Sequence, residues 1–174
     1  NQMVIGRNIV VKDILYSFDQ NGHLRQGLQE NVQDQAGNVG SYYYTDQAPY
    51  VFQGELKVNG KWRCFGSNGK MIQNQIYDLG SKTVYYGEDG GMVYGEKKIG
   101  DDWYYFDTYS GAMYTGFVQL SGKTVYYYEN GAMAHGSFEI EGVPYYSDDY
   151  TGAVLLGLQK VDDKTYYYTT KGAL

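Results

Sequence analysis

A repeat of 41 residues constrains the fold of this chain more than any other feature. The segment KTVYYGEDGGMVYG (residues 82–95) recurs as KTVYYYENGAMAHG (residues 123–136), and KTYYYTTKGAL (residues 164–174) begins 41 residues later. Periods of about 20–50 residues are typical of solenoids, propellers and arrays, in which each unit packs on its neighbours. We therefore expect a repeat protein.

Two glycine positions divide the chain into shorter units. The first is occupied by Gly22, Gly69, Gly90, Gly111, Gly131, Gly152 and Gly172, with steps of 21, 21, 20, 21 and 20 from Gly69 onward and with Tyr50 in the second unit. The second is occupied by Gly27, Gly54, Gly95, Gly116, Gly136 and Gly157, with Asn74 in one unit. Glycine and asparagine tolerate a left-handed backbone, so both positions predict tight turns.

The residues between the glycines predict β-strands. Each unit has a tyrosine-rich strand, a turn at Asn-Gly, Asp-Gly or Ser-Gly, a short second segment such as residues 132–136, and a third segment such as FVQL (residues 117–120). No window shows the 3.6-residue period of a helix. We predict an all-β fold, an elongated β-solenoid of stacked β-hairpins built from repeats of about 20 residues.

The regularity of the repeats changes along the chain. Residues 58–174 form regular hairpin repeats, whereas residues 1–57 are divergent N-terminal repeats of the same solenoid. The step from Gly22 to Tyr50 is 28 residues, about eight more than the usual step. We interpret the excess as a loop inserted around residues 31–40.

Composition and charge exclude several functional classes. The net charge is −6, and no basic cluster exceeds the adjacent pair Lys97 and Lys98, so a nucleic-acid partner is excluded. No apolar run reaches the ~18 residues of a membrane span. Cys64 has no second cysteine with which to form a disulfide. The start, NQMVIG, suggests a fragment of a longer chain.

The polar residues do not predict catalysis or a metal site. A hydrolase needs two carboxylates held in a cleft, yet the Asp and Glu residues are mostly turn residues that other repeats replace. His23 and His135 fall at different repeat positions, and no second ligand shares their register. We expect no cofactor, no metal and no enzymatic activity.

The repeat motif resembles that of a known family. Residues Lys61-Trp62, the segment DWYYFD (residues 102–107), and Gly-Ala-Met at residues 111–113 and 131–133 are similar to the cell-wall-binding repeats of Gram-positive surface proteins. That family includes choline-binding modules, glucan-binding domains of glucansucrases and C-terminal repeats of large clostridial toxins. The resemblance implies a β-solenoid with ligand sites between successive units.

The resemblance also bears on the choice of ligand. Choline-binding modules have a Trp after the second glycine of each repeat, and here the position is occupied by Leu28, Glu55, Gln75, Glu96, Phe117, Ser137 and Leu158. The absence of Trp favours a neutral sugar polymer, because pyranose faces lie on aromatic rings while their hydroxyls need donors and acceptors. The residues predicted to bind it are Trp62, Tyr85, Lys98, Trp103, Tyr105, Phe117, Gln119 and Tyr126.

These features predict a non-catalytic carbohydrate-binding module, secreted or at the bacterial cell surface. It would anchor a larger protein, such as a glucansucrase or a cell-wall lysin, to α-glucan or to a Gram-positive cell-wall polysaccharide. Two alternatives stay open. One is a module that binds choline on teichoic acid, and the other is an adhesin or stalk whose repeats bind a protein.

Overall fold

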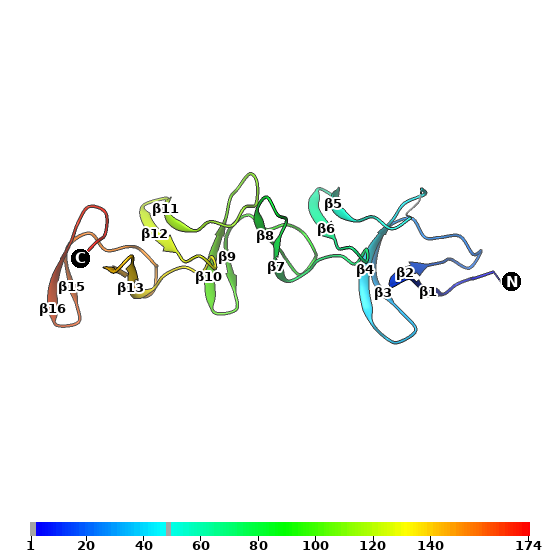
Figure 1. Ribbon diagram of the computed structural model, residues 1–174, viewed down its shortest axis with the longest axis horizontal. Coiled ribbons are helices and arrows are strands. Elements are labelled where there is room, and N and C mark those ends of the chain that lie inside the picture. Colours follow the sequence, from blue (N-terminus) through cyan, green and yellow to red (C-terminus); the bar gives the residue numbers. More distant parts are fainter. Residues whose placement is uncertain (1–2, 48–49) are drawn as a thin grey trace. The chain divides into compact units, whose positions relative to one another are not determined.

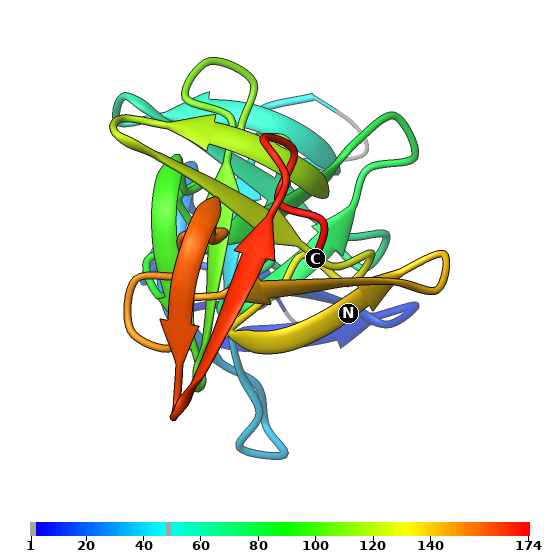
Figure 2. The same cartoon turned by 90° about the vertical axis from the view of Figure 1, so that its left-hand side faces the viewer.

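The protein is an all-β chain throughout its described part. The computed structural model describes residues 3–47 and 50–174, and these ranges contain sixteen β-strands and no helix. The strands form eight two-stranded antiparallel sheets, each made of two consecutive strands (Figure 1 and Figure 2). The predicted all-β class and the β-hairpins are therefore confirmed. Nothing in these ranges is a helix long and apolar enough to cross a membrane.

The chain divides into two compact units, one ending at Val93 and one comprising residues 94–174. The N-terminal unit contains β1 (Asn8–Val11), β2 (Ile14–Ser17), β3 (Gly27–Gln33), β4 (Val39–Tyr44), β5 (Gly54–Val58), β6 (Lys61–Phe65), β7 (Gln75–Asp78) and β8 (Thr83–Tyr86). The C-terminal unit contains β9 (Gly95–Ile99), β10 (Asp102–Phe106), β11 (Gly116–Leu120), β12 (Lys123–Tyr127), β13 (Gly136–Ile140), β14 (Val143–Ser147), β15 (Gly157–Val161) and β16 (Lys164–Tyr168). The change in regularity expected between residues 57 and 58 stays a prediction.

Each hairpin joins the third predicted segment of one repeat to the tyrosine strand that follows it. For example, β11 and β12 pair along their whole length and are joined by residues 121 and 122. The hairpin turn predicted from the sequence lies later, at Gly131, and for the main ladder this prediction is wrong. The segment after Gly131 is too short to form a ladder. It lies between the positive-φ residues Gly131 and Gly136, and within it only Met133 forms a bridge, to Tyr127.

The segment inserted near the N-terminus lengthens a hairpin. The pairing of β3 with β4 shifts register after Gln29 and then continues to Gln33 and Val39. Asp34 closes the remaining turn, since its carboxylate accepts hydrogen bonds from two backbone N–H groups at 2.9 and 2.8 Å. The loop predicted over residues 31–40 is therefore shorter than expected, because a carboxylate-stabilised turn lets the flanking residues pair.

A backbone hydrogen bond with a constant sequence separation ties hairpins together within each unit. The N–H donors and C=O acceptors are Met71–Ser41, Met92–Trp62, Met133–Trp103, Val154–Thr124 and Leu174–Pro144, with N···O distances of 2.7–2.8 Å. The separation is 30 residues in every pair. Two-stranded hairpins are marginal in water on their own, so these contacts hold the hairpins in a fixed register that gives them a shared core.

The last residue of the aromatic strand supplies a buried side chain in most repeats. This position is occupied by Tyr44, Phe65, Tyr86, Phe106, Tyr127, Ser147 and Tyr168, which are 0–3% exposed. Burial of such large rings contributes most of the hydrophobic stabilisation of a hairpin array. By contrast, Tyr109 and Tyr150 are 96% and 92% exposed. The tyrosines at the ends of the aromatic strands thus belong to the core, whereas these two turn tyrosines face solvent.

Gly131 shows why the turn position requires glycine. Its φ is +82°, and a Cβ atom there would lie 2.4 Å from the sulfur of Met113, which belongs to the preceding repeat. A left-handed backbone and lack of space therefore both exclude a side chain. The two predicted substitutes for glycine also have positive φ, +51° at Asn74 and +63° at Tyr50. The interpretation of these positions as backbone requirements is confirmed.

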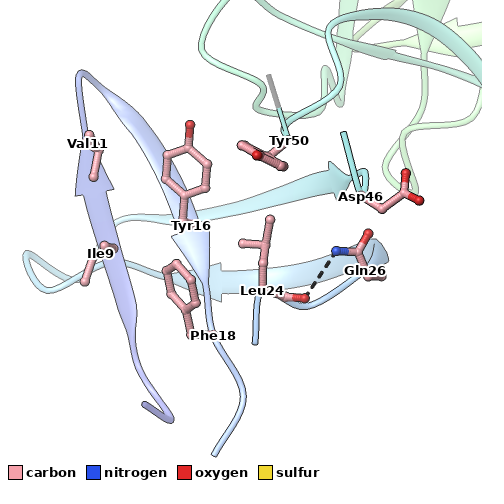
Figure 3. A pocket seen from close by; sticks show the side chains of 8 residues that line it. All are labelled: Ile9, Val11, Tyr16, Phe18, Leu24, Gln26, Asp46 and Tyr50. Atoms are coloured by element: carbon pink, nitrogen blue, oxygen red, sulfur yellow. Dashed lines mark hydrogen bonds between the residues drawn. The ribbon is translucent and has the colours of Figure 1, made fainter. Parts of the chain in front are cut away.

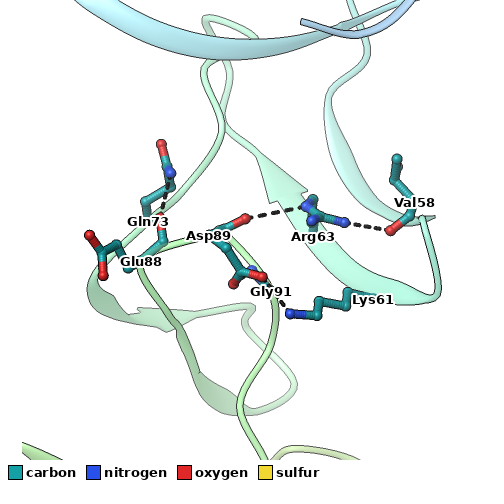
Figure 4. Close-up of polar contacts among 7 residues, drawn as sticks. All are labelled: Val58, Lys61, Arg63, Gln73, Glu88, Asp89 and Gly91. Carbon is teal, nitrogen blue, oxygen red and sulfur yellow. Dashed lines mark hydrogen bonds and ion pairs between the residues drawn. The ribbon is translucent and has the colours of Figure 1, made fainter. Parts of the chain in front are cut away.

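A buried arginine joins the β5–β6 hairpin to the turn after β8 (Figure 4). Arg63 is 5% exposed, and its guanidinium donates hydrogen bonds to the backbone carbonyls of Val58 and Asp89. The Asp89 carboxylate accepts hydrogen bonds from the Lys61 ammonium and from the backbone N–H of Gly91. The Lys61 ammonium is the main cause of the lowered pKa of Asp89. Since the folded-state pKa is depressed, this contact stabilises the fold above the unfolded pKa and weakens as pH falls.

Tyr86 and Tyr127 occupy the same repeat position but differ in hydrogen bonding. The Tyr86 hydroxyl donates to Glu55 Oε1 at 2.9 Å, whereas the buried Tyr127 hydroxyl has no partner among the described residues. We expect Tyr86→Phe to lower the free energy of unfolding by about 1 kcal/mol. We expect Tyr127→Phe to be neutral or stabilising. Denaturant unfolding of both variants measures this, and a greater loss for Tyr127→Phe would contradict it.

Candidate functional site

A pocket lies beside Trp103 in the C-terminal unit. Its volume is about 200 Å³, and it is lined by Glu96, Trp103, Lys123, Met133, Tyr150 and Thr151. The hairpin β9–β10 supplies Glu96 and Trp103, β12 begins with Lys123, and the segments after β12 and β14 supply the other three. Docking of consecutive hairpins therefore assembles the pocket from segments that are distant in sequence.

The apolar wall of the pocket is formed by Trp103 and Met133. The Trp103 carbonyl accepts a hydrogen bond from the Met133 N–H at 2.8 Å, which holds the two residues side by side. Trp103 is 39% exposed. A partly exposed indole can stack on the apolar face of a sugar or attract a cation through the charge distribution of its ring.

The polar wall of the pocket is formed by Lys123 and Glu96. Lys123 Nζ donates to the backbone carbonyl oxygen of Thr151 at 2.7 Å and lies 3.7 Å from Glu96 Oε1. Both side chains are partly exposed, so they can also reach a ligand. Together they offer donors and an acceptor beside the indole.

The rim of the pocket is a turn held by Asp148. One carboxylate oxygen accepts hydrogen bonds from the N–H groups of Tyr150 and Thr151, at 3.1 and 2.8 Å, and from the Thr151 hydroxyl at 2.8 Å. The N–H and then the hydroxyl of Thr151 lower the pKa of Asp148, because hydrogen bonds favour the ionised form. The highly exposed ring of Tyr150 is therefore presented by a stable turn.

Four aromatic rings from two consecutive hairpins form a second feature of this unit, here called the four-ring cluster. Its members are Phe117, Tyr126, Phe138 and Tyr145, with centroid distances of 5.0 Å (Phe117–Tyr126), 5.1 Å (Tyr126–Phe138), 5.4 Å (Phe138–Tyr145) and 5.5 Å (Tyr145–Phe117). Phe117 is 46% exposed and Phe138 only 6%. The cluster thus stabilises the contact between hairpins and presents one open ring.

The structure brings some of the predicted site residues together. Phe117 and Tyr126 are neighbours in the four-ring cluster, and Lys98 is exposed directly opposite Trp103 in the β9–β10 ladder. In the N-terminal unit, Trp62 is 43% exposed whereas Tyr85 is 6% exposed. Of these two, only Trp62 presents a large ring surface to solvent.

Two other predicted residues are engaged in local contacts. The Tyr105 ring packs on Tyr114 and Tyr127, with centroid distances of 5.3 and 6.5 Å. The Gln119 side chain donates to the backbone carbonyls of Leu120 and Lys123 and accepts a hydrogen bond from Thr124. Neither contact tests ligand binding, so the role of both residues stays a prediction.

Comparison with known proteins agrees with this repeat architecture. Residues 77–116, which include Glu96 and Trp103, match the family model of the choline-binding repeat. The fold is similar to that of choline-binding protein F from Streptococcus pneumoniae, with a TM-score of 0.73 and 27% sequence identity over 91% of this chain. Residues 77–116 are therefore a choline-binding repeat, and the chain resembles the cell-wall-binding repeat family. Its resemblance to that family, stated from the sequence, is thereby confirmed.

A second solved structure is also similar in fold. CbpJ from Streptococcus pneumoniae TIGR4 has a TM-score of 0.75 and 26% identity over 99% of this chain. The present chain spans 55% of choline-binding protein F and 65% of CbpJ, which is less than two thirds of either. No curated protein sequence is significantly similar to the chain.

Most residues that line the pocket were missed by sequence reasoning, although the repeats carried a signal for them. Trp103 is the one lining residue among the predicted site residues, which do not include Glu96, Lys123, Met133, Tyr150 or Thr151. Each of the six has a counterpart 41 residues earlier, at Glu55, Trp62, Lys82, Met92, Tyr109 and Ser110. The identity or similarity of all six pairs singles them out within these cell-wall-binding repeats. A search for positions that are matched at this spacing would have included them.

Proposed function

We propose that the chain is a non-catalytic module that attaches a larger extracellular protein to choline-bearing polymers of a Gram-positive cell wall. The match of residues 77–116 to the choline-binding repeat carries this proposal. The fold similarity to choline-binding protein F and to CbpJ, both from Streptococcus pneumoniae, supports it. This is the alternative named from the sequence, and these matches favour it over an α-glucan ligand.

The pocket beside Trp103 suits a small organic cation. A trimethylammonium group can lie on the indole, with Met133 as a second apolar surface and the Glu96 carboxylate as a counter-charge. The Lys123 ammonium is already engaged by Glu96 and by the Thr151 carbonyl, which reduces its repulsion of a bound cation. A single site of this kind binds weakly, and several repeats would gain by avidity.

A neutral glycan, such as α-glucan, is the second candidate ligand. The polar wall favours it, since Lys123 and Glu96 offer donors and an acceptor beside a ring on which a pyranose face can stack. The predicted site residues Trp62, Lys98, Phe117 and Gln119 belong to this second proposal. If neither choline nor a glycan bound, the remaining sequence-based alternative, a stalk or adhesin that binds a protein, would be favoured.

The predicted solenoid belongs to the same proposal. The hydrogen bonds with a 30-residue separation occur in both units and support stacking of successive hairpins as the building principle of the array. Stacked hairpins would present repeated ligand sites, which is the arrangement that a weak-affinity anchor needs.

Titration calorimetry with choline, 3,3-dimethylbutanol and dextran tests the ligand class. Choline and 3,3-dimethylbutanol have the same shape but differ in charge, so a cation site binds only the first appreciably. Glu96→Gln should weaken choline binding several-fold through loss of a partly exposed counter-charge. The same variant should leave dextran binding nearly unchanged. Equal binding of choline and its neutral analogue would contradict the proposal.

Replacing Trp103 with Thr is expected to weaken ligand binding by about 1–3 kcal/mol, because it removes the stacking surface of the pocket. The fold should be retained, since Thr124 and Thr165 occupy the equivalent position in other repeats. Calorimetry measures the affinity, and circular dichroism checks the fold. Unchanged affinity in a folded Trp103→Thr variant would remove this pocket from the binding site.

A further inference from the structure

A polar pocket in the N-terminal unit lies beside the lengthened β3–β4 hairpin. Its volume is about 430 Å³, and its lining includes Val39, Asn68, Lys70, Ile72, Gln73 and Gln75. Val39 belongs to the inserted part of the hairpin, which the later, regular repeats do not contain. The other five lie between the end of β6 and the first residue of β7. The volume falls within the range of about 300–1,000 Å³ that is usual for organic ligands.

The lining of the polar pocket combines amides with one positive charge. Another pocket of the same unit, at the first hairpin, is walled mainly by apolar side chains such as Ile9 and Phe18 and includes the Asp46 carboxylate (Figure 3). The polar pocket instead has three side-chain amides and one ammonium, and no carboxylate among the described residues that line it. Amides both donate to and accept from hydroxyls, and an ammonium attracts an anion. This lining therefore favours a ligand that is rich in hydroxyls and negatively charged.

Lys70 is an exception to the repeat pattern. Its position, directly after the turn glycine, is occupied in the later repeats by Gly91, Ala112, Ala132, Ala153 and Ala173. Lys70 forms a bridge with Tyr42, and a Cβ atom at Gly40 would lie 3.1 Å from Lys70 Cε, so the glycine leaves room for the lysine side chain. Lys61 pairs with Asp89, whereas the Lys70 ammonium has no ion-pair or hydrogen-bond partner among the described residues. The pocket therefore contains a positive charge that none of these residues neutralises.

The three amides have some polar atoms engaged and others open to a ligand. Gln73 Nε2 donates to the Glu88 backbone carbonyl at 2.7 Å, which fixes the side chain and leaves its oxygen as an acceptor (Figure 4). The Glu88 carboxylate is not among the groups that line the pocket. Asn68 Oδ1 accepts from the Lys70 backbone N–H at 3.0 Å, which leaves the Asn68 NH₂ group as a donor. Gln75 is exposed and offers both a donor and an acceptor.

We propose that this pocket binds a sugar that carries a carboxylate, such as a hexuronate unit of an acidic glycan. The Lys70 ammonium pairs with the carboxylate, the three amides bind ring hydroxyls, and Val39 with Ile72 contacts the C–H face of the ring. One ammonium balances one negative charge, which favours a carboxylate over a doubly charged phosphate monoester. The proposal is independent of the function proposed above, because none of these residues lines the pocket beside Trp103.

Three probes test the proposal on the full chain: methyl β-D-glucuronide, methyl β-D-glucoside and acetate. The two sugars differ in one group, a carboxylate in place of a hydroxymethyl, and acetate carries the charge without the ring. NMR titration that follows the side-chain amide signals gives the affinities. The glucuronide should bind about three- to fivefold more tightly than the glucoside, the contribution of one partly exposed charge pair. Acetate should bind more weakly than the glucuronide.

Two lysines provide a matched pair of variants. In Lys70→Ala the preference for the glucuronide over the glucoside should disappear, and the fold should be retained because alanine occupies this position in four later repeats. Lys57→Ala removes the same charge from an exposed residue of β5 that does not line the pocket. It should leave the preference unchanged.

Gln75→Glu reverses the electrostatics of the pocket with almost no change in shape. Glutamate occupies this position in two other repeats, at Glu55 and Glu96, so the fold should be retained. The added carboxylate should weaken glucuronide binding about three- to fivefold, since like charges at a partly exposed site repel by about as much as opposite charges attract. Binding of the uncharged glucoside should change by less than about twofold.

The outcomes separate this proposal from the choline proposal. Lys70→Ala should leave choline binding unchanged, and Trp103→Thr should leave glucuronide binding unchanged. Equal affinities of the parent protein for the glucuronide and the glucoside, or the same loss of preference in Lys57→Ala as in Lys70→Ala, would overturn the proposed site. Absence of measurable binding of both sugars to the parent protein would also overturn it.

Discussion

Replacing Phe106 with Ala is expected to lower the free energy of unfolding by about 3–5 kcal/mol, the usual loss when a buried aromatic ring is truncated. Phe106 is 0% exposed and ends the aromatic strand of its repeat, the position occupied by a buried ring in most repeats. The loss combines the hydrophobic contribution of the ring with a cavity that rigid neighbouring hairpins fill poorly. Denaturant unfolding followed by tyrosine and tryptophan fluorescence measures the change.

Phe117→Ala is the matched control for Phe106→Ala. The chemical change is identical and both residues lie in the C-terminal unit, but Phe117 is 46% exposed. Phe117→Ala should lower the free energy of unfolding by only about 0.5–1.5 kcal/mol, mainly because the ring contacts with Tyr126 and Tyr145 are lost. Similar losses for the two variants would show that the buried ring position does not form the core of the repeat.

Replacing Gly131 with Ala is expected to lower the free energy of unfolding by about 2–5 kcal/mol, as the sum of two effects. A left-handed backbone disfavours alanine by about 1–2 kcal/mol, and overpacking against Met113 adds about 1–3 kcal/mol. Thermal and denaturant unfolding of the variant measure the total.

Gly116→Ala separates the two effects at Gly131. Its φ of +77° is similar to the +82° of Gly131, but beyond its own chain neighbours no atom lies within 4 Å of the position that its Cβ would occupy. Gly116→Ala should therefore lower the free energy of unfolding by about 1–2 kcal/mol, through the backbone effect alone. The double variant Gly131→Ala with Met113→Ala should recover part of the loss, because the smaller side chain makes room. Equal losses for Gly116→Ala and Gly131→Ala would rule out the contact with Met113 as a determinant.

The local features of the fold were predictable from sequence, and the strand pairing was less so. The positive φ of Tyr50 and Asn74 followed from their alignment with glycines, because backbone requirements repeat with the sequence. The choice of hairpin partner did not follow. Tyrosine strands such as β12 are flanked by turn signals on both sides, and only the number of extended residues between turns decides which neighbour forms the ladder.

The candidate site was predictable only in part, since it is assembled from distant segments. Trp103 was identified because a large ring stands where other repeats have Thr. Lys123 and Thr151, by contrast, meet across 28 residues through a hydrogen bond to a backbone carbonyl, and only the comparison of repeats 41 residues apart carries a signal for them.

The contact between a turn glycine and the preceding repeat has a consequence for how such chains change in length. Met71 lies against Gly90, Met113 against Gly131 and Met133 against Gly152, so each such contact is shared by two adjacent repeats. A duplication or deletion of whole repeats again places a large side chain against the turn glycine of the next repeat, so contacts of this kind are preserved. An insertion or deletion whose length is not a whole number of repeats would place the large side chain against a residue other than glycine. Genetic exchange in units of the repeat is therefore the change in length that this architecture tolerates best.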